Sequence, residues 1–146
     1  MKYTIIRVSQ DNYSKFDAMV YWRINKREQE QIRMDWPKEI ENTNLHVYAI
    51  EVEEKFVGWT SMIFIPKVGI VNRKGYVYVE ELWIQESYRR KGYARLLMEK
   101  ANEVAIHYDA SGIRLGVNVE NPNALDLYKK CGYHVTGQAY TMEKVK

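Results

Sequence analysis

The sequence has very few of the residues that build disulfides and metal sites. It contains one cysteine, Cys131, so a disulfide within the chain is excluded and a reducing cytoplasm is the expected compartment. The three histidines (His46, His107 and His134) are far apart in the sequence, and none has metal-ligand spacing to the cysteine. We therefore expect no metal centre.

Long apolar runs and an excess of one charge are also missing. No stretch approaches the roughly 20 apolar residues of a membrane span, and the first residues lack the apolar run of a signal peptide. The 22 basic and 19 acidic side chains are balanced between the two halves of the chain. Neither a membrane nor a nucleic acid is therefore an expected partner. The 146 residues, 46% of them apolar, suffice for the core of one domain spanning 1–146.

The first forty residues predict a strand and a helix. Residues 3–8 read as a short strand, and Asp11 or Asn12 is the expected cap of the helix that follows. Residues 26–41 are highly charged and only weakly amphipathic. The residues expected to be buried are Ile32, Trp36 and Ile40. Pro37 is expected to break the segment.

The middle of the chain predicts a hairpin and a long strand. Residues 46–53 and 55–65 are rich in β-formers and predict antiparallel strands, followed by a loop over 66–75. Residues 76–84 predict another strand, whose apolar alternation slips by one residue at Glu80-Glu81. Such a slip indicates a β-bulge; the alternative is a strand buried on both faces, with Tyr76 and Tyr78 inside.

The last third alternates helix and strand. A helix is predicted from about residue 93 to 108 and a strand over 113–119, an order that favours two parallel strands joined by a helical crossover. Asn121 is the expected N-cap of a last helix, and Gly132 is its expected C′ residue. Residues 133–145 predict two short strands turning at Gly137-Gln138.

A basic turn precedes the helix that starts near residue 93. Backbone N–H groups at a helix start lack intrahelical partners and carry partial positive charge, so a diphosphate can bind there if the backbone is accessible. Gly92 allows that approach, and Ala94 keeps the next turn small. Taken alone, such a turn is more often a solvated cap. The turn reads Arg89-Arg90-Lys91-Gly92-Tyr93-Ala94.

Two motifs in order make the pattern more specific. Arg89-x-x-Gly92-x-Ala94 resembles the cofactor motif of the GNAT acetyltransferases, Arg/Gln-x-x-Gly-x-Gly/Ala. The run from Asn121 to Tyr133 resembles the second motif, Asn-x-x-Ala-x-x-Leu-Tyr followed by Gly-Phe/Tyr. Residues 76–131 are also similar to spermidine/spermine N-acetyltransferases. Ala94 replaces the commoner glycine, a change that the family tolerates.

The resemblance implies an α/β fold with a mixed central sheet and helices on both faces. Its fourth and fifth strands splay apart to admit the pantetheine arm of acetyl-CoA, the implied cosubstrate. The residues that the resemblance assigns to acetyl-CoA are the backbone of Leu82, Trp83 and Ile84, the pyrophosphate turn Arg89, Arg90, Lys91, Gly92, Tyr93 and Ala94, and Asn121.

Acetyl transfer needs a base for the amine and an acid for the leaving thiolate. The resemblance places a catalytic glutamate at Glu80, although Glu81 is adjacent and both carboxylates could instead be exposed charges. The N–H of Leu82, freed by the bulge, is the expected oxyanion donor. Tyr128 is the proposed acid, but it also fits an apolar helical face and could be core. Cys131, on the same face, is expected to be a buried structural thiol.

We therefore predict an N-acetyltransferase acting on a small-molecule or peptide amine, with a homodimer as one possible state. The alternatives are a CoA-binding sensor or scaffold without turnover, and an interaction protein with a degenerate pocket. Glu80 and Tyr128 together favour the enzyme, because a pure binder does not need them. Tryptophans that could line an acceptor pocket, or simply fill the core, are Trp22, Trp36 and Trp59.

Overall fold

The computed structural model describes residues 2–69 and 74–146. Contacts divide the chain into two units, Met1–Gly116 and Val117–Lys146, and each is treated by itself. The single domain expected from the sequence stays a prediction. The loop expected over 66–75 has no helix or strand where it is described, and residues 70–73 lie outside the described residues.

The first unit is a five-stranded sheet with strand order β1-β2-β3-β4-β5. The strands β1 to β4 pair antiparallel, and β4 pairs with β5 in parallel. The sequence predicted two of these pairings, the antiparallel hairpin of β2 and β3 and the parallel pair of β4 and β5. The elements of this unit are β1 (Thr4–Arg7), α1 (Tyr13–Asn25), the 3-10 turn η1 (Lys38–Glu41), β2 (Leu45–Val52), β3 (Lys55–Ile65), β4 (Tyr76–Ile84), the 3-10 turn η2 (Glu86–Tyr88), α2 (Tyr93–Tyr108) and β5 (Ile113–Leu115).

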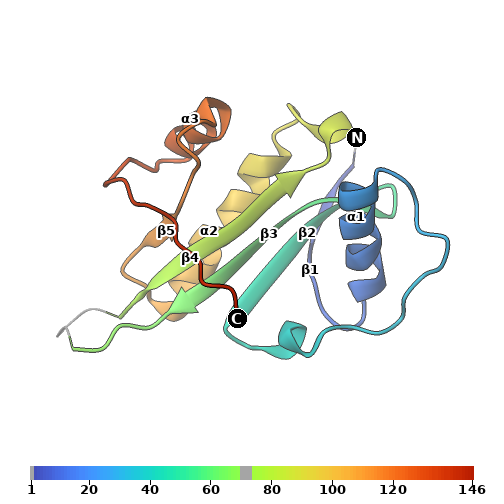
Figure 1. Ribbon diagram of the computed structural model, residues 1–146, viewed down its shortest axis with the longest axis horizontal. Coiled ribbons are helices and arrows are strands. Elements are labelled where there is room, and N and C mark those ends of the chain that lie inside the picture. The colour runs from blue at the N-terminus through green and yellow to red at the C-terminus, as the bar shows by residue number, and fades with distance from the viewer. Residues whose placement is uncertain (1, 70–73) are drawn as a thin grey trace. The chain divides into compact units, whose positions relative to one another are not determined.

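Alternating residues of the strands build a separate core on each face of the sheet. One cluster, on the α1 side, holds Phe16 and Met19 of α1 with strand residues such as Ala49. The other, on the α2 side, holds Tyr93 and Leu97 of α2 with the next strand residue, Ile50. Because strand side chains alternate between faces, consecutive residues can serve different clusters. Figure 1 shows α1 and α2 on opposite faces of the sheet, which confirms the mixed α/β architecture predicted from the sequence.

Two sequence expectations fail between α1 and η1. Ile32 is 72% exposed and Trp36 is 43% exposed, so neither is a buried point. Residues 26–37 contain no helix or strand among the described residues, and without a regular period no apolar face forms there. Ile40, in contrast, packs against the α1-side cluster. Pro37 does end the irregular segment, because η1 begins directly after it.

The second unit contains α3 (Pro122–Lys130). The side chain of Asn121 accepts a hydrogen bond from the Ala124 N–H at 3.1 Å, which confirms the predicted N-cap. Gly132 follows the C-cap residue with a φ of 95°, the left-handed conformation expected at C′. Cys131 is half-buried, which is more exposed than the buried thiol that the sequence suggested.

The two strands predicted over 133–145 are absent from this fully described stretch of the chain. The sequence suggested two strands turning at Gly137-Gln138, but a strand needs a neighbour for its backbone hydrogen bonds. The side chains of residues 134–146 are exposed, Tyr140 by 97%. The strand predicted over 113–119 is also shorter than expected, since β5 ends at Leu115.

A buried histidine lies where β2 meets the end of α2. His46 is 4% exposed, and its Nε2 lies 2.5 Å from the Tyr108 hydroxyl, which in turn donates to the Thr43 carbonyl at 3.0 Å. Nε2 therefore carries the proton of the neutral ring, and Nδ1 is buried with no partner among the described residues. Burial lowers the pKa of His46 to about 4, and the charges of Arg7 and His107 act in the same direction.

This pKa predicts that acid weakens the fold. The unfolded chain binds the His46 proton near pH 6.5 and the folded chain only near pH 4, so this stabilisation is complete above pH 6.5 and is lost as the pH falls towards 4. The difference amounts to about 3 kcal/mol of unfolding free energy. Urea unfolding of the wild type and of His46→Gln at several pH values measures it.

In His46→Gln the unfolding free energy should change much less between pH 6.5 and 4 than in the wild type, because glutamine does not titrate. The matched control is His134→Gln, which removes an exposed histidine and should keep the wild-type slope. Equal slopes for the wild type and His46→Gln would contradict the assignment.

Candidate functional site

The ladder between β3 and β4 contains one extra residue. Ser61 pairs with Glu81 and Met62 pairs with Val79, so the register skips Glu80. This shift confirms the β-bulge predicted at Glu80-Glu81. The alternative, a strand with its tyrosines fully inside, is wrong, because Tyr76 and Tyr78 are only half-buried.

The bulge also marks the end of the parallel pairing. β5 pairs with β4 from Val77 to Val79, and beyond that point Glu80–Ile84 has a strand neighbour on the β3 side only, among the described residues. The pairing of the two strands thus stops at the residue just before the bulge. The result is an open backbone edge along the second half of β4.

The direction of the backbone groups on this edge follows from one hydrogen bond. The Gln85 N–H donates to the Val57 carbonyl of β3 at 2.8 Å. Since successive N–H groups of a strand point to opposite sides, the N–H groups of Leu82 and Ile84 point away from β3. The N–H of Leu82, the oxyanion donor expected from the sequence, therefore lies on the open edge.

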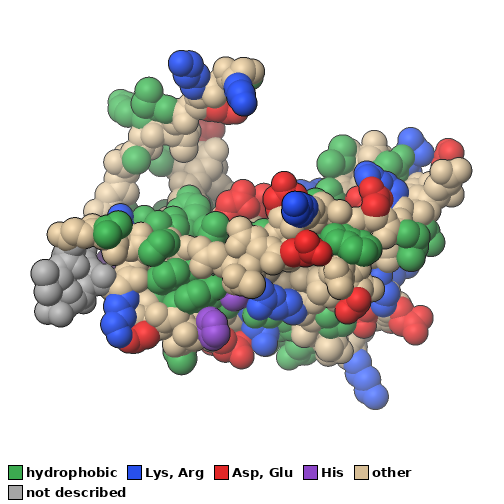
Figure 2. Space-filling model, turned by 90° about the horizontal axis from the view of Figure 1, so that it is seen from below, with side chains coloured by type: hydrophobic (Ala, Val, Ile, Leu, Met, Phe, Trp, Pro, Cys, Tyr) green, Lys and Arg blue, Asp and Glu red, His purple; other side chains and the backbone are tan. Residues whose placement is uncertain are grey.

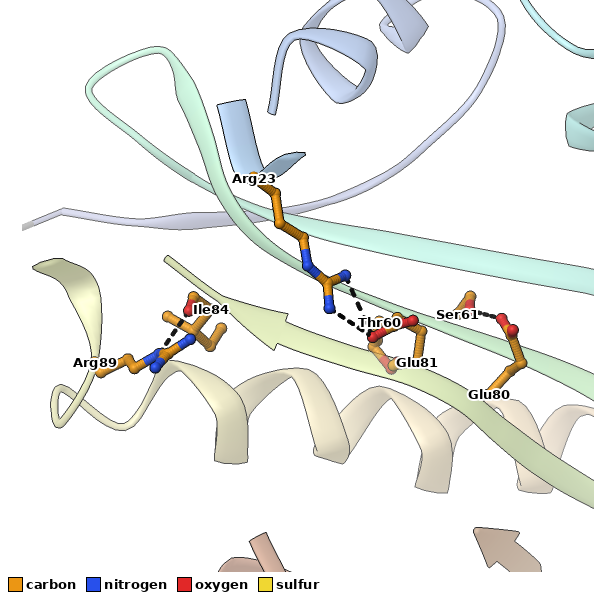
Figure 3. Close-up of polar contacts among 7 residues, drawn as sticks. All are labelled: Arg23, Thr60, Ser61, Glu80, Glu81, Ile84 and Arg89. Atoms are coloured by element: carbon orange, nitrogen blue, oxygen red, sulfur yellow. Dashed lines mark hydrogen bonds and ion pairs between the residues drawn. The ribbon is translucent and has the colours of Figure 1, made fainter. Parts of the chain in front are cut away.

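The two glutamates of the bulge have different partners, drawn in Figure 3. Glu80 is exposed, and its Oε2 accepts a hydrogen bond from the Ser61 hydroxyl at 2.8 Å. Glu81 is half-buried, and its Oε1 lies 3.3 Å from a guanidinium nitrogen of Arg23 in α1. The same guanidinium lies over the ring of Trp83, 5.2 Å from its centroid. Arg23 thus holds Glu81, while Glu80 keeps one oxygen for another partner.

The basic turn lies at the end of this open edge. Gly92 is the N-cap of α2 with a φ of 83°, and no side chain of the described residues caps that helix start. A Cβ built at Gly92 would meet no atom of the described residues within 4 Å, so the backbone there is accessible. Unsatisfied N–H groups, an approachable backbone and the adjacent cations Arg90 and Lys91 fit a diphosphate.

Three residues of the turn have structural contacts as well. The Nε of Arg89 donates to the Ile84 carbonyl at 2.8 Å, which ties the turn to the end of β4 (Figure 3). The side chain of Tyr93 is 5% exposed and packs in the α2-side cluster, so only its backbone faces the turn. Ala94 is half-buried and packs against the same cluster.

The predicted site residues are divided between the two units. Glu80, the edge residues Leu82–Ile84 and the turn 89–94 lie in the first unit, whereas Asn121 and Tyr128 lie in the second. Within its own unit, Tyr128 packs near Tyr133, with ring centroids 6.2 Å apart. That the two sets form one site stays a prediction.

Neither the other three tryptophans nor the groove beside α1 contributes a residue to this site. Trp22 and Trp59 pack against the α1-side cluster, whereas Trp36 is partly exposed. A shallow groove between α1 and the irregular segment after it is separate from the glutamate pair. Its lining residues are Asp17, Tyr21, Arg27, Gln29, Glu30, Gln31 and Arg33.

The described residues contain no group of three or more potential metal ligands. None of the described helices has the length and apolar character needed to cross a membrane. On the face shown in Figure 2, cationic and anionic side chains are interspersed.

Comparison with known proteins decides the family. The sequence model described as the acetyltransferase (GNAT) family matches residues 11–133. The chain belongs to the GNAT acetyltransferase family. This match covers both motifs of the sequence analysis and confirms the resemblance stated there.

One curated relative of this GNAT chain is the bovine (Bos taurus) thialysine N-epsilon-acetyltransferase, 36% identical over 56 residues. That alignment covers 38% of this chain and 33% of the relative, so the chain spans about a third of the length of the curated protein it matches.

Solved structures share the fold. An aminoglycoside acetyltransferase from an uncultured soil metagenomic sample, in complex with sisomicin, has a TM-score of 0.78 at 16% identity, covering 99% of this chain and 96% of that one. The aminoglycoside N-acetyltransferase AAC(6′)-Iy in complex with CoA has a TM-score of 0.78 at 11% identity, covering 98% and 100%. At these identities the likeness concerns the fold alone.

Sequence reasoning missed three residues around the bulge: Arg23, Thr60 and Ser61. A signal for two of them was present, because Thr60-Ser61 is a pair of hydroxyls in the middle of an otherwise apolar strand. Both are buried, Thr60 at 0% and Ser61 at 3% exposure, and buried hydroxyls need partners. Nothing in the sequence links Arg23 to Glu81, which lies 58 residues later in the chain.

Proposed function

We propose that this chain is an N-acetyltransferase that moves an acetyl group from acetyl-CoA to a primary amine. The observation that carries the proposal is the open edge of β4, which begins at the Glu80 bulge and leads to the Gly92 turn. One end of this edge presents a carboxylate, and the other presents an anion site. The family match supports the same chemistry.

The reaction needs a neutral amine, and a primary amine has a pKa near 10.4 in water. At pH 7 a base must therefore take a proton. In our proposal Glu80 takes it, directly or through one water, as the amine nitrogen bonds to the acetyl carbon. Glu80 is exposed and holds one hydrogen bond to Ser61, whereas Glu81 is paired with Arg23. This difference supports Glu80 as the base.

The other two roles concern the acetyl oxygen and the sulfur. The outward N–H of Leu82 would donate to the oxygen as it gains negative charge. The carbon–sulfur bond then breaks, and the hydroxyl of Tyr128 would protonate the thiolate. The nitrogen of the new amide would lose its remaining extra proton, through water, to the Tyr128 phenolate, which restores the hydroxyl and leaves a neutral amide and free CoA. Arg90, Lys91 and the N–H groups after Gly92 would bind the pyrophosphate, and Asn121 would add a contact to the same cosubstrate.

Acetyl-CoA binding should depend on Gly92. Wild-type protein should gain roughly 2.7 kcal/mol of stability at 100 times the dissociation constant, read as a higher Tm. Gly92→Val should lose most of this shift, since the side chain would fill the open space that a diphosphate needs. Isothermal titration with acetyl-CoA measures the affinity directly.

Gly69→Val is the matched control. Gly69 has nearly the same φ, 85°, and a Cβ there would also meet no described atom within 4 Å, so both variants carry similar backbone strain. Only Gly92→Val should weaken binding. Equal affinities for the two variants would remove the turn from the proposed site.

Activity is tested by the release of free CoA from acetyl-CoA in the presence of an amine panel. The names of related proteins direct the panel first to thialysine and then to aminoglycosides such as sisomicin. We expect at least one amine to raise CoA release more than tenfold over the amine-free rate. Binding of acetyl-CoA without turnover for any amine would instead support a CoA-binding sensor.

Tyr128→Phe should separate the acid from a packing role. The change removes one hydroxyl and keeps the ring next to Tyr133. If the hydroxyl protonates the thiolate, kcat should fall by about 10²–10⁴, with little change in affinity for acetyl-CoA. Steady-state kinetics with the acceptor amine measures this loss. A kcat within a few-fold of the wild type, with chemistry rate-limiting, would assign Tyr128 to packing.

A further inference from the structure

We propose that Ser61 is a positioning residue that orients the Glu80 carboxylate for proton transfer. The inference rests on the proposed function, because it assumes that Glu80 is the base. It adds a residue of β3 that lies outside both family motifs found in the sequence.

The contact is made by a buried donor and an exposed acceptor. Ser61 is 3% exposed, and its hydroxyl donates to Glu80 Oε2 at 2.8 Å. A serine hydroxyl has a single proton to donate. That proton is therefore committed to one carboxylate oxygen, and Glu80 Oε1 is left for the amine or water.

The bulge explains why Glu80 needs this contact. A residue skipped by the ladder has no cross-strand partner to fix its direction. An exposed glutamate side chain also has several rotamers, and restricting them costs entropy. A hydroxyl from the rigid centre of β3 selects one of these rotamers before the substrate arrives.

The face on which the carboxylate lies follows from the neighbours of Ser61. Trp59, two residues earlier in β3, packs in the α1-side cluster, so Ser61 points to the same side. Arg23 of α1 meets Glu81 on that side too. Both carboxylates thus lie on the α1 face, but Arg23 occupies Glu81, and Ser61 leaves Glu80 available.

Thr60 provides an internal comparison. It is as buried as Ser61 and points to the opposite face, and its hydroxyl donates to the backbone carbonyl of Glu81 at 2.8 Å. Thr60 therefore supports the backbone of the bulge, whereas Ser61 holds a side chain (Figure 3). Removal of either hydroxyl should cost stability, but only Ser61 should act through the Glu80 carboxylate.

A double-mutant cycle with Glu80→Gln tests this, using the full chain and an acceptor from the amine panel. Glu80→Gln should lower kcat by about a hundredfold, and Ser61→Ala by about tenfold with an unchanged KM for acetyl-CoA. In the Glu80→Gln background, Ser61→Ala should change kcat less than about twofold, because the group it orients is no longer a base.

Thr60→Val is the matched control, since it removes an equally buried hydroxyl. Its loss in kcat should be the same with and without Glu80→Gln. Ser61→Thr keeps the hydroxyl and should restore kcat to within about threefold of the wild type. Thermal unfolding of each variant identifies any that fail to fold. Ser61→Ala removes only the hydroxyl oxygen, so it should disturb the packing of β3 little.

The outcomes distinguish the role of Ser61 from the proposed function. No turnover with any amine overturns the proposed function, and the role of Ser61 with it. Wild-type turnover in Glu80→Gln overturns Glu80 as the base and therefore the role of Ser61, while acetyl transfer itself stands. If Glu80→Gln lowers kcat but Ser61→Ala keeps full activity, the role of Ser61 alone is overturned. The same is true if Ser61→Ala lowers kcat equally in both backgrounds.

Discussion

The site depends on one extra residue in β4. A strand alternates with a period of two, so the insertion of Glu80 shifts every later side chain and N–H group to the other side. Val79 still pairs with β5, but the N–H groups of Leu82 and Ile84 point to an edge where the described residues place no strand. Without this shift the ladder between β3 and β4 would be continuous, and the glutamates would be ordinary strand residues.

A bulge disturbs the ladder, and nearby polar contacts compensate for it. Thr60 donates to the Glu81 carbonyl, Ser61 to the Glu80 carboxylate, and Arg23 pairs with the Glu81 carboxylate. The two hydroxyls are buried, and each would be costly if left without a partner. The contacts come from both faces of the sheet, so the bulge is held as a unit.

The sequence predicted the fold where the signals were local. The slip of apolar residues in 76–84 located the bulge, and Asn121 and Gly132 located the two ends of α3. Caps and alternation are set by neighbours within a few residues, and such signals are readable in one chain.

What the sequence could not predict depends on contacts between distant segments. The pairing of Arg23 with Glu81 requires α1 to lie over β4, and no local pattern encodes that packing. The exposed Ile32 shows the reverse, an apolar residue with no face to join. The strands expected over 133–145 are absent for the same reason, because a local turn signal does not supply a neighbouring strand.

The bond between the Arg89 Nε and the Ile84 carbonyl has a consequence for substrate choice. It ties the turn before α2 to the end of β4, and so helps to set the distance between the outward N–H of Leu82 and the accessible start of α2 at Gly92. The distance between the acetyl carbonyl and the pyrophosphate of a bound thioester must therefore match this distance in the protein. A thioester whose arm is shorter or longer than this distance would place its carbonyl out of reach of Leu82 when its phosphates are bound. Acyl carriers would then be selected by the length of the arm between their thioester and their phosphates.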